Sequence, residues 1–216
     1  MRLPFHSRRT FGPSAPGARL ALALGIISFA PIARPQSPES ATKLGGVTAP
    51  AVHDGQHDFD FLIGAWKFHL KRLIHPLTGS TTWVEFDGTA RAQKILGGRA
   101  NVDEISVEGP TGKVEGLTLR MYSPQSRQWS IYWGNLRDGN LGLPAIATVG
   151  SFKDGHGEFF DHEPINGRWI FVRYVWFDIT PDSARFEQSF SADGGRTWEV
   201  NWITSQTRIP SERTSP

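Results

Sequence analysis

Between His57 and Arg208, short apolar segments alternate with turn sequences. Within most segments hydrophobic and polar residues follow a period of two. Turn sequences such as Asp154-Gly155 and Asn166-Gly167 separate the segments. The turns recur roughly every 8–15 residues, which is typical of antiparallel strands joined by hairpins. The pattern predicts ten strands, at residues 66–74, 82–94, 99–107, 115–122, 128–134, 145–152, 157–163, 168–178, 184–191 and 197–206.

These strands predict one all-β domain over residues 57–208. Consecutive strands joined by short hairpins form an antiparallel up-and-down meander, and such a sheet hides its edges most simply by closing into a barrel. A sandwich of two sheets is the structural alternative. One short helical turn, near residues 58–63, precedes the first predicted strand.

The first 33 residues are organised like a signal peptide. Four arginines and no acid precede an apolar run of 11 residues, Leu20–Ala30, which is too short to span a bilayer and suits a secretory signal. The stretch Ser7-Arg8-Arg9-Thr10-Phe11 also resembles the twin-arginine export signal. We therefore predict a signal peptide at residues 1–33, export to the periplasm or the extracellular space, and no membrane span after its removal.

Two flanks surround the predicted domain. Residues 34–56 are rich in Pro, Ser, Ala and Gly, a composition typical of a flexible lead-in. Residues 209–216 are predicted to form a disordered tail.

Composition narrows the classes of function. The formal net charge is +2, from 23 Lys+Arg and 21 Asp+Glu. Removal of residues 1–33 would take away four arginines and no acid, so 19 basic side chains would stand against 21 acidic ones. The shortened chain then lacks the excess of positive charge that is typical of nucleic-acid-binding proteins. The chain has no Cys, which excludes disulfides, thiolate metal ligands and thiol nucleophiles.

The more apolar face of each predicted hairpin indicates which side chains point into the barrel. In the first hairpin the inward residues are Trp66, Phe68, Leu70 and Arg72, opposite Trp83 and Glu85. In the fourth and fifth strands they are Leu117, Leu119 and Met121, facing Trp129, Ile131 and Trp133. In the last three strands they are Trp169, Phe171, Arg173, Val175, Phe177, Phe186, Gln188, Phe190, Trp198, Val200 and Trp202.

Polar side chains inside this apolar lumen are candidate ligand contacts, because an unpaired buried charge is costly. A structural ion pair between Arg72 and Glu85 is one interpretation, and an anchor for the polar head of an aromatic ligand is the other. The predicted ligand-binding residues are Arg72, Trp83, Glu85, Trp133, Arg173, Gln188 and Trp202. A register error of one residue would exchange the faces and bring in Tyr174, Glu187 and Asn201 instead.

The segment from Phe61 to Trp66, FLIGAW, resembles the N-terminal kernel of lipocalins and related calycin barrels. In those proteins Gly-x-Trp follows a short helical turn, the Trp plugs one end of the barrel, and an Arg from the last strand stacks on it. The resemblance implies that Gly64, Trp66 and Arg208 form a closed barrel end here, with a cation–π contact between Arg208 and Trp66.

Three segments, HDFDFLIGAW (57–66), LGGRANVDE (96–104) and ITPDSARFEQSFSADGGRTWEVNW (179–202), resemble an uncharacterised family of bacterial proteins that are often exported and predicted to form calycin-like barrels. The resemblance implies a fold and no activity. Nitrobindin-like haem proteins share the ten-strand barrel and take their haem His from near the C-terminus. The last His in this chain is His162, so haem is not expected and no other cofactor is predicted.

Residues 191–198, SADGGRTW, match the Asp-box pattern known from glycosidases. In sialidases this motif marks hairpins away from the catalytic site and recurs across propeller blades, whereas here it occurs once. We interpret it as a hairpin turn in which Asp193 accepts hydrogen bonds from its own turn. His156, Glu158, Asp161 and His162 gather around another hairpin, and we interpret them as solvated residues, so no metal site is predicted.

No motif for a serine nucleophile, a metalloprotease or a phosphate-binding loop occurs in the chain, and no catalytic residue is predicted. The predicted function is an exported barrel that holds a small hydrophobic or aromatic ligand in its lumen without chemistry. One alternative is an isomerase or hydrolase with Glu85 or Glu187 as general base. The other is a structural or interaction module whose exposed Trp and Tyr face a partner.

Overall fold

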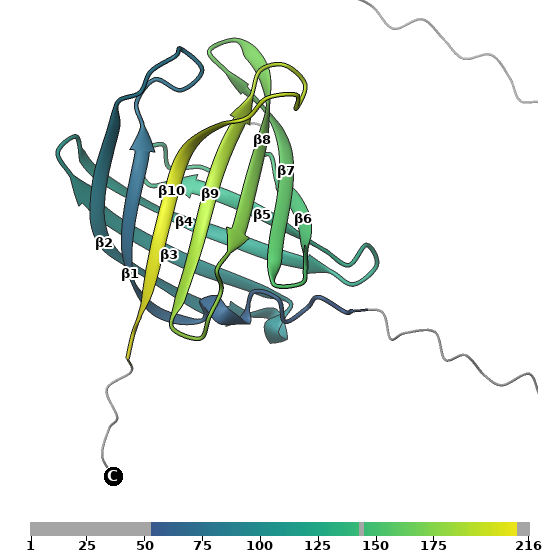
Figure 1. The fold of residues 1–216 in the computed structure, drawn as a ribbon. Coiled ribbons are helices and arrows are strands. Elements are labelled where there is room, and N and C mark those ends of the chain that lie inside the picture. Colours follow the sequence, from purple (N-terminus) through teal and green to yellow (C-terminus); the bar gives the residue numbers. More distant parts are fainter. Residues whose placement is uncertain (1–52, 143–144, 211–216) are drawn as a thin grey trace, which may run out of the picture. The chain divides into compact units, whose positions relative to one another are not determined.

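The computed structural model describes residues 53–142 and 145–210, which form a closed antiparallel barrel of ten strands (Figure 1). Consecutive strands pair along the chain, and β1 pairs with β10 to close the sheet. The strands are β1 (Gly64–Leu73), β2 (Trp83–Ile95), β3 (Ala100–Gly109), β4 (Gly112–Ser123), β5 (Gln128–Asn135), β6 (Thr148–Lys153), β7 (His156–Ile165), β8 (Arg168–Phe177), β9 (Ser183–Ser191) and β10 (Glu199–Ile209). The predicted all-β, calycin-like up-and-down barrel is therefore confirmed.

Two short 3-10 helices accompany the strands, η1 (Asp60–Leu62) and η2 (Leu96–Gly98). The first is the helical turn predicted before the first strand. Neither helix of the described ranges has the length and apolarity needed to cross a membrane.

The predicted signal peptide lies outside the described residues, as do residues 34–52 of the predicted lead-in and residues 211–216 of the predicted tail. The described part of the lead-in contacts the barrel. The Gly55 carbonyl accepts a hydrogen bond from Trp129 Nε1 at 2.9 Å, and Asp54 Oδ1 accepts one from the Tyr122 hydroxyl at 2.9 Å. Ile209 pairs with Ala65 in the sheet, so the barrel domain extends beyond residues 57–208 at both ends.

The chain that leads into β1 closes one end of the barrel, at the lower side of Figure 1. Leu62 and Trp66 are almost fully buried there, and Trp66 Nε1 donates to the Leu62 carbonyl at 2.7 Å. The guanidinium carbon of Arg208 lies 4.2 Å from the centroid of the Trp66 ring. Gly64 has a φ of 118°, and a Cβ there would lie 2.9 Å from Arg208 Nη1, so a side chain at this position would disturb the contact.

The opposite end, which we call the mouth, has an incomplete wall between β5 and β6. These strands pair at only three positions, from Trp129 opposite Gly150 to Ile131 opposite Thr148. Among the described residues, the C-terminal half of β5, residues 132–135, has no β6 partner. The segment that follows β5 borders the lumen at this end, where Leu141 and Ile146 line a cavity.

Candidate functional site

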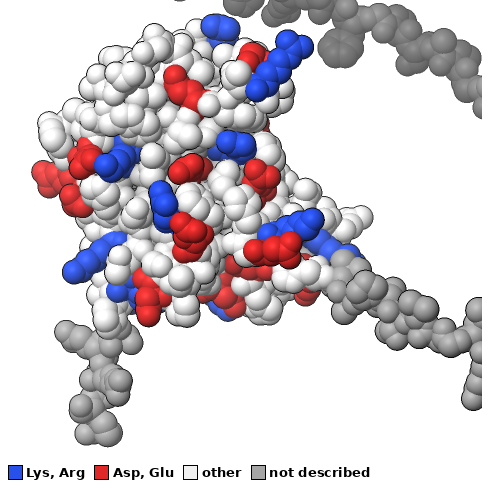
Figure 2. Space-filling model, viewed as in Figure 1, with Lys and Arg blue, Asp and Glu red and all other residues white. Residues whose placement is uncertain are grey.

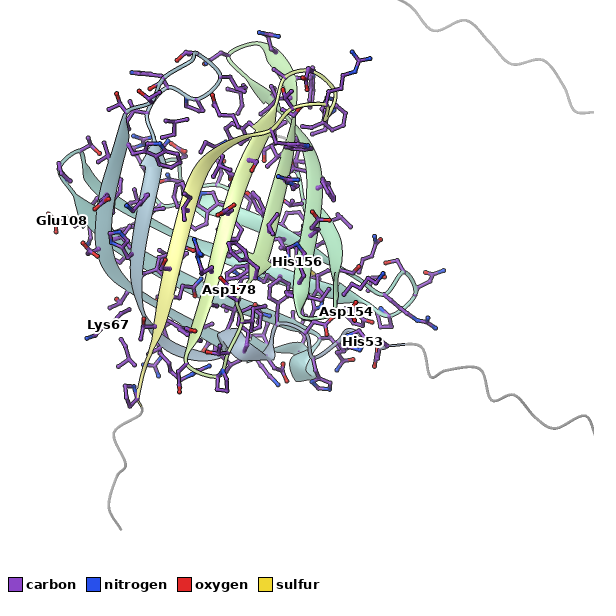
Figure 3. The ribbon with its side chains drawn as sticks, viewed as in Figure 1. His53, Lys67, Glu108, Asp154, His156 and Asp178 are labelled. Atoms are coloured by element: carbon purple, nitrogen blue, oxygen red, sulfur yellow. The ribbon has the colours of Figure 1, made fainter. Side chains whose placement is uncertain are left out.

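Side chains from the strands extend into the barrel, whereas the labelled Lys67 and Glu108 point away from it (Figure 3). The interior contains two adjoining cavities. The inner cavity, of about 100 Å³, lies toward the closed end and is bounded there by Leu62 and Trp66. The outer cavity, of about 510 Å³, lies at the mouth and reaches Arg72. Five residues line both cavities: Ile131, Trp133, Tyr174, Gln188 and Trp202.

Aromatic rings form much of the wall of the inner cavity. They belong to Trp66, Phe68, Trp133, Tyr174, Trp176, Phe186 and Trp202. Flat apolar walls with a few polar groups between them are typical of sites for small molecules. The arrangement suits a planar, largely apolar molecule.

An ion pair is buried in the wall of the inner cavity. Arg120 Nη1 lies 2.7 Å from Asp103 Oδ2 and also donates to Asn101 Oδ1 at 3.1 Å. Asp103 Oδ1 accepts a hydrogen bond from the Thr118 backbone N–H at 3.1 Å. The side chains of Arg120 and Asp103 are only 4% and 7% exposed. The pair is held by the adjacent strands β3 and β4, whose register sets Asn101 opposite Arg120.

Four buried side chains that line the inner cavity have a polar atom with no hydrogen-bond partner among the described residues. These atoms are Arg120 Nε, Trp176 Nε1, Thr204 Oγ1 and Gln206 Nε2. Each of the four residues is at most 5% exposed. Buried polar groups in folded proteins are nearly always paired, and an unpaired one costs about 1–3 kcal/mol. A molecule bound in the inner cavity could supply the partners that the described residues do not provide.

A pair of carboxyl groups lies near the mouth. Thr148 Oγ1 donates to Asp161 Oδ2 at 2.6 Å, and Glu163 lines the outer cavity. Burial, followed by the charge and hydrogen bond of Asp161, raises the pKa of Glu163 to about 7. Burial also raises the pKa of Asp161 and, together with the charges of these acids, that of Tyr174. Glu163 therefore retains its proton to a higher pH than an ordinary glutamate does.

The structure brings four of the seven predicted ligand-binding residues to the cavities: Arg72, Trp133, Gln188 and Trp202. Two of the three residues predicted for a shifted register, Tyr174 and Asn201, also line the outer cavity. Tyr174 of β8, a strand whose predicted orientation is wrong, lies opposite Gln188, and Asn201 joins Trp202 because a register shift between Val200 and Trp202 interrupts the pairing of β10 with β9. Consecutive residues Asn201 and Trp202 therefore both face the lumen, and Gln188 Nε2 donates to Asn201 Oδ1 at 2.7 Å.

The predicted inward positions of Trp83 and Glu85 are wrong. Arg72 pairs with Val84 in the sheet, so Val84 faces the interior and its two neighbours face out. Basic and acidic side chains interleave on the outer surface seen in Figure 2. Glu85 joins such a pairing, with its Oε1 2.6 Å from Lys71 Nζ, and the hydrogen bond from Lys71 lowers the pKa of Glu85. The predicted Arg72–Glu85 ion pair is therefore absent.

The predicted orientation of β8 is also wrong. Val172 and Trp176 are buried inside, so Arg173 faces outward, where its guanidinium carbon lies 4.7 Å from the centroid of the Trp198 ring. Phe171 is 42% exposed. Both faces of β8 are rich in apolar residues, so their difference in polarity does not decide the orientation. Glu187, from the shifted set, faces outward as well, opposite Ile203 of β10.

Sequence reasoning missed the buried Arg120 and Asp103. The leucines of β4 were expected inside, yet Leu117 is 40% exposed and Arg120 only 3%. A usable signal was present in the β3–β4 hairpin. Its Gly109–Gly112 turn fixes the register and brings one acid and one base to diagonal positions on the same face.

The side chains predicted to gather around the hairpin of β6 and β7 lie on both sides of the barrel wall. Asp161 faces the lumen, and His162 lies outside between the rings of Trp169 and Phe171, at centroid distances of 4.7 and 5.0 Å. No group of three His, Asp or Glu side chains in the described ranges is placed to hold a metal ion. Trp169, Phe171 and Phe160 form an exposed aromatic cluster on this outer face.

Comparison with solved structures supports the fold. The chain resembles the S-type phycobiliprotein lyase CPES from Guillardia theta, with a TM-score of 0.52 and 10% sequence identity, over 74% of this chain and 96% of that chain. A second structure, EF1p2_mFAP2b bound to DFHBI, has a TM-score of 0.39 at 10% identity, over 72% of this chain and 99% of that chain. No protein-family model and no curated protein matches the chain. At this identity the lyase likeness shows the barrel fold alone.

Proposed function

We propose that this protein is an exported barrel that binds a small, planar, largely aromatic molecule in its lumen. The observation that carries the proposal is the aromatic-lined inner cavity, which adjoins a larger cavity at the mouth. An unfilled cavity in a protein interior costs about 24 cal/mol per Å³. For the inner cavity, of about 100 Å³, this sets an upper limit of about 2 kcal/mol, because the cavity adjoins the one at the mouth. A ligand that fills it recovers this free energy.

The dimensions of the cavities limit the size of the ligand. The inner cavity, of about 100 Å³, accommodates little more than one ring system. The outer cavity, of about 510 Å³, falls in the range of roughly 300–1,000 Å³ that small-molecule sites occupy. The molecule would place one planar end between Trp66 and Trp176 and extend past Trp133 and Trp202 toward the mouth.

Native mass spectrometry of the purified protein tests this proposal, repeated after denaturing extraction. We expect an additional mass that is lost on denaturation. The Ala90→Leu variant fills the inner cavity, because Ala90 lines it and is only 7% exposed, and should abolish retention of that mass. The Ala65→Leu variant adds the same volume on the outer face of β1 and should retain it. A bare mass, together with tryptophan fluorescence that is indifferent to aromatic compounds, would contradict ligand binding.

Export is a separate part of the proposal and derives from the sequence of residues 1–33. Expression of the full chain in a bacterial host, followed by separation of periplasm from cytoplasm, tests it. We expect a shortened protein in the periplasmic fraction. Replacing both Arg8 and Arg9 by Lys should leave the protein in the cytoplasm if the twin-arginine route is used. The same cytoplasmic location for the wild-type chain would contradict export.

A second candidate function is general acid–base catalysis at the mouth, favoured by the pKa of about 7 for Glu163. A carboxyl group that titrates near neutral pH both accepts and donates protons efficiently. The bases predicted from the sequence, Glu85 and Glu187, face outward, so Glu163 takes their place in this hypothesis. Incubation of the retained molecule with the wild-type protein and with the Glu163→Gln variant, followed by chromatography, tests it. Equal product formation by both proteins would exclude Glu163 as the base.

A further inference from the structure

We propose that the deep end of the lumen is a subsite for a neutral hydrogen-bond acceptor, such as a carbonyl oxygen carried on the buried aromatic end of the ligand. This inference rests on the proposed function, because it states which polar group of the ligand meets which residues of the same lumen. It begins from the unpaired atoms Arg120 Nε, Trp176 Nε1, Thr204 Oγ1 and Gln206 Nε2.

These unpaired atoms are predominantly donors. An arginine Nε–H, an indole N–H and an amide N–H₂ only donate, and the threonine hydroxyl either donates or accepts. The four residues come from three parts of the barrel wall: β4 supplies Arg120, β8 supplies Trp176, and β10 supplies Thr204 and Gln206. All four line the inner cavity. A group that satisfies them must therefore present lone pairs.

The depth of these residues places the acceptor away from the mouth. Gln206 lies opposite Phe68 in the sheet, nearer the closed end than Trp202, which lies opposite Arg72. The guanidinium carbon of Arg120 lies 5.1 Å from the centroid of the Phe59 ring, and Phe59 belongs to the segment that closes the barrel. The polar end of the ligand therefore enters first, and its remaining surface lies against the rings above.

The charges around the subsite indicate that the acceptor is neutral. Asp103 already neutralises Arg120 at 2.7 Å, and the pair is almost wholly buried. A ligand carboxylate would add an uncompensated negative charge beside Asp103, which is costly in a buried site. A ligand cation would meet mostly donors, and the Asp103 carboxylate that also lines the cavity is already paired with Arg120. A ketone, aldehyde or amide oxygen carries two lone pairs, so it accepts from up to two of these N–H groups without adding a charge.

Binding of three naphthalene derivatives of similar size tests the inference. They are 2-acetylnaphthalene, which carries a neutral carbonyl, 2-ethylnaphthalene, which carries no acceptor, and 2-naphthoate, which carries a charge. Tryptophan quenching and native mass spectrometry at pH 8 measure their dissociation constants for the purified protein. We expect 2-acetylnaphthalene to bind at least tenfold more tightly than either of the others.

Two variants each remove one donor and leave an apolar side chain in its place. Gln206→Met and Trp176→Phe should each weaken binding of 2-acetylnaphthalene about fivefold or more and leave that of 2-ethylnaphthalene unchanged or tighter. Gln93→Met is the matched control, because Gln93 is exposed on β2, and should change neither value. Circular dichroism melting identifies any variant that fails to fold, and the comparison among the three ligands on the wild-type protein does not depend on the variants.

The outcomes separate the subsite from the proposed function. Equal binding of the ketone and the hydrocarbon, unchanged in both donor variants, would overturn the acceptor subsite and leave lumen binding in place. Tightest binding of 2-naphthoate would overturn the inference that the acceptor is neutral. Binding that persists in the Ala90→Leu variant would place the ligands outside the inner cavity and overturn the inference. No binding of any derivative by the folded wild-type protein would count against the proposed function itself.

Discussion

Arg120 and Asp103 form an ion pair inside the barrel, with Arg120 Nη1 2.7 Å from Asp103 Oδ2. The guanidinium group also lies near the rings of Phe59 and Trp176, at 5.1 and 5.8 Å from their centroids. One arginine thus links the wall formed by β3 and β4 to the segment that closes the barrel. The same residue holds a charge, neutralised by Asp103, beside the lumen.

We expect Asp103→Asn to lower the free energy of unfolding by about 3–5 kcal/mol, because it leaves the buried Arg120 without its counter-charge. Urea denaturation followed by tryptophan fluorescence measures the change. Asp87→Asn is the control, because the Asp87 side chain is 81% exposed, and should change the free energy by less than about 1 kcal/mol. Equal effects of the two substitutions would show that the Arg120–Asp103 pair contributes little.

Replacement of Arg208 even by the similarly charged Lys should destabilise the barrel. Its guanidinium group donates to the carbonyls of Phe61 at 2.7 Å, Ile63 at 2.8 Å and Pro181 at 2.6 Å, while it stacks on Trp66. A lysine ammonium cannot reproduce this planar set of donors. We expect Arg208→Lys to lower the free energy of unfolding by about 2–3 kcal/mol.

Arg91→Lys provides the comparison for Arg208, because Arg91 is exposed on the outer face of β2. Thermal and urea unfolding of both variants should show a large loss only for Arg208→Lys. A loss no greater than that of Arg91→Lys would mean that the closed end is held by the packing of Trp66 alone.

The Asp-box hairpin has the hydrogen bonds predicted for a turn. Asp193 Oδ1 accepts from the backbone N–H groups of Arg196 at 3.0 Å and Thr197 at 2.9 Å, and Oδ2 accepts from the Thr197 hydroxyl at 2.7 Å. We expect Asp193→Ala to speed amide hydrogen exchange at Arg196 and Thr197, measured by mass spectrometry or NMR. Asp87→Ala should leave these amides unchanged.

The pH dependence of this hairpin follows from the bonds to Asp193. The backbone hydrogen bond from Thr197, and then its hydroxyl and that of Ser191, lower the pKa of Asp193 to about 2 from an ordinary value of 3.8. The stabilisation is therefore fully present above pH 3.8 and is lost as pH falls through about 2. Protection of the two amides that stays constant down to pH 2 would contradict this role.

The fold could be predicted from the sequence because strands and turns are local features. Period-two segments bounded by turns that contain Gly, Pro, Asn or Asp located all ten strands. The aromatic alternation of Trp129, Ile131 and Trp133 gave the correct inner face of β5. The residues of the closed end, Gly64, Trp66 and Arg208, were identified from the lipocalin-like kernel. The contact between Arg208 and Trp66 joins β10 to β1, which lie far apart in the sequence.

The candidate site was harder to predict because its interior is partly polar. On β4, Thr118 and Arg120 face inward while Leu117 is exposed, so a rule that buries the more apolar face selects the wrong side. Asp161 was interpreted as a solvated hairpin residue, which is wrong, and Glu163 was missed. Their inward position depends on how β7 pairs with β8, which places Asp161 opposite the buried Val172. Residues that serve a polar cavity break the pattern from which burial is predicted.

Glu163 should make the stability of the barrel depend on pH in the opposite sense to Asp193. Its pKa is about 7 in the folded protein, raised first by burial and then by Asp161, against an ordinary value of 4.5. Between these two pH values the folded protein retains a proton that the unfolded chain has lost. The free energy of unfolding should therefore fall as pH rises from about 4.5 to 7.

Substitution isolates this contribution of Glu163, because Gln has no ionisation in the range. We expect the free energy of unfolding of the wild-type protein to fall steadily relative to that of Glu163→Gln as pH rises from 4.5 to 7.5. Urea denaturation measures both values. Glu158→Gln is the matched control, because Glu158 is exposed on the outer face of the same strand, and its difference from the wild type should stay nearly constant. Parallel pH profiles for the two variants would show that Glu163 ionises freely in the folded barrel, and the second candidate function would then lose its basis.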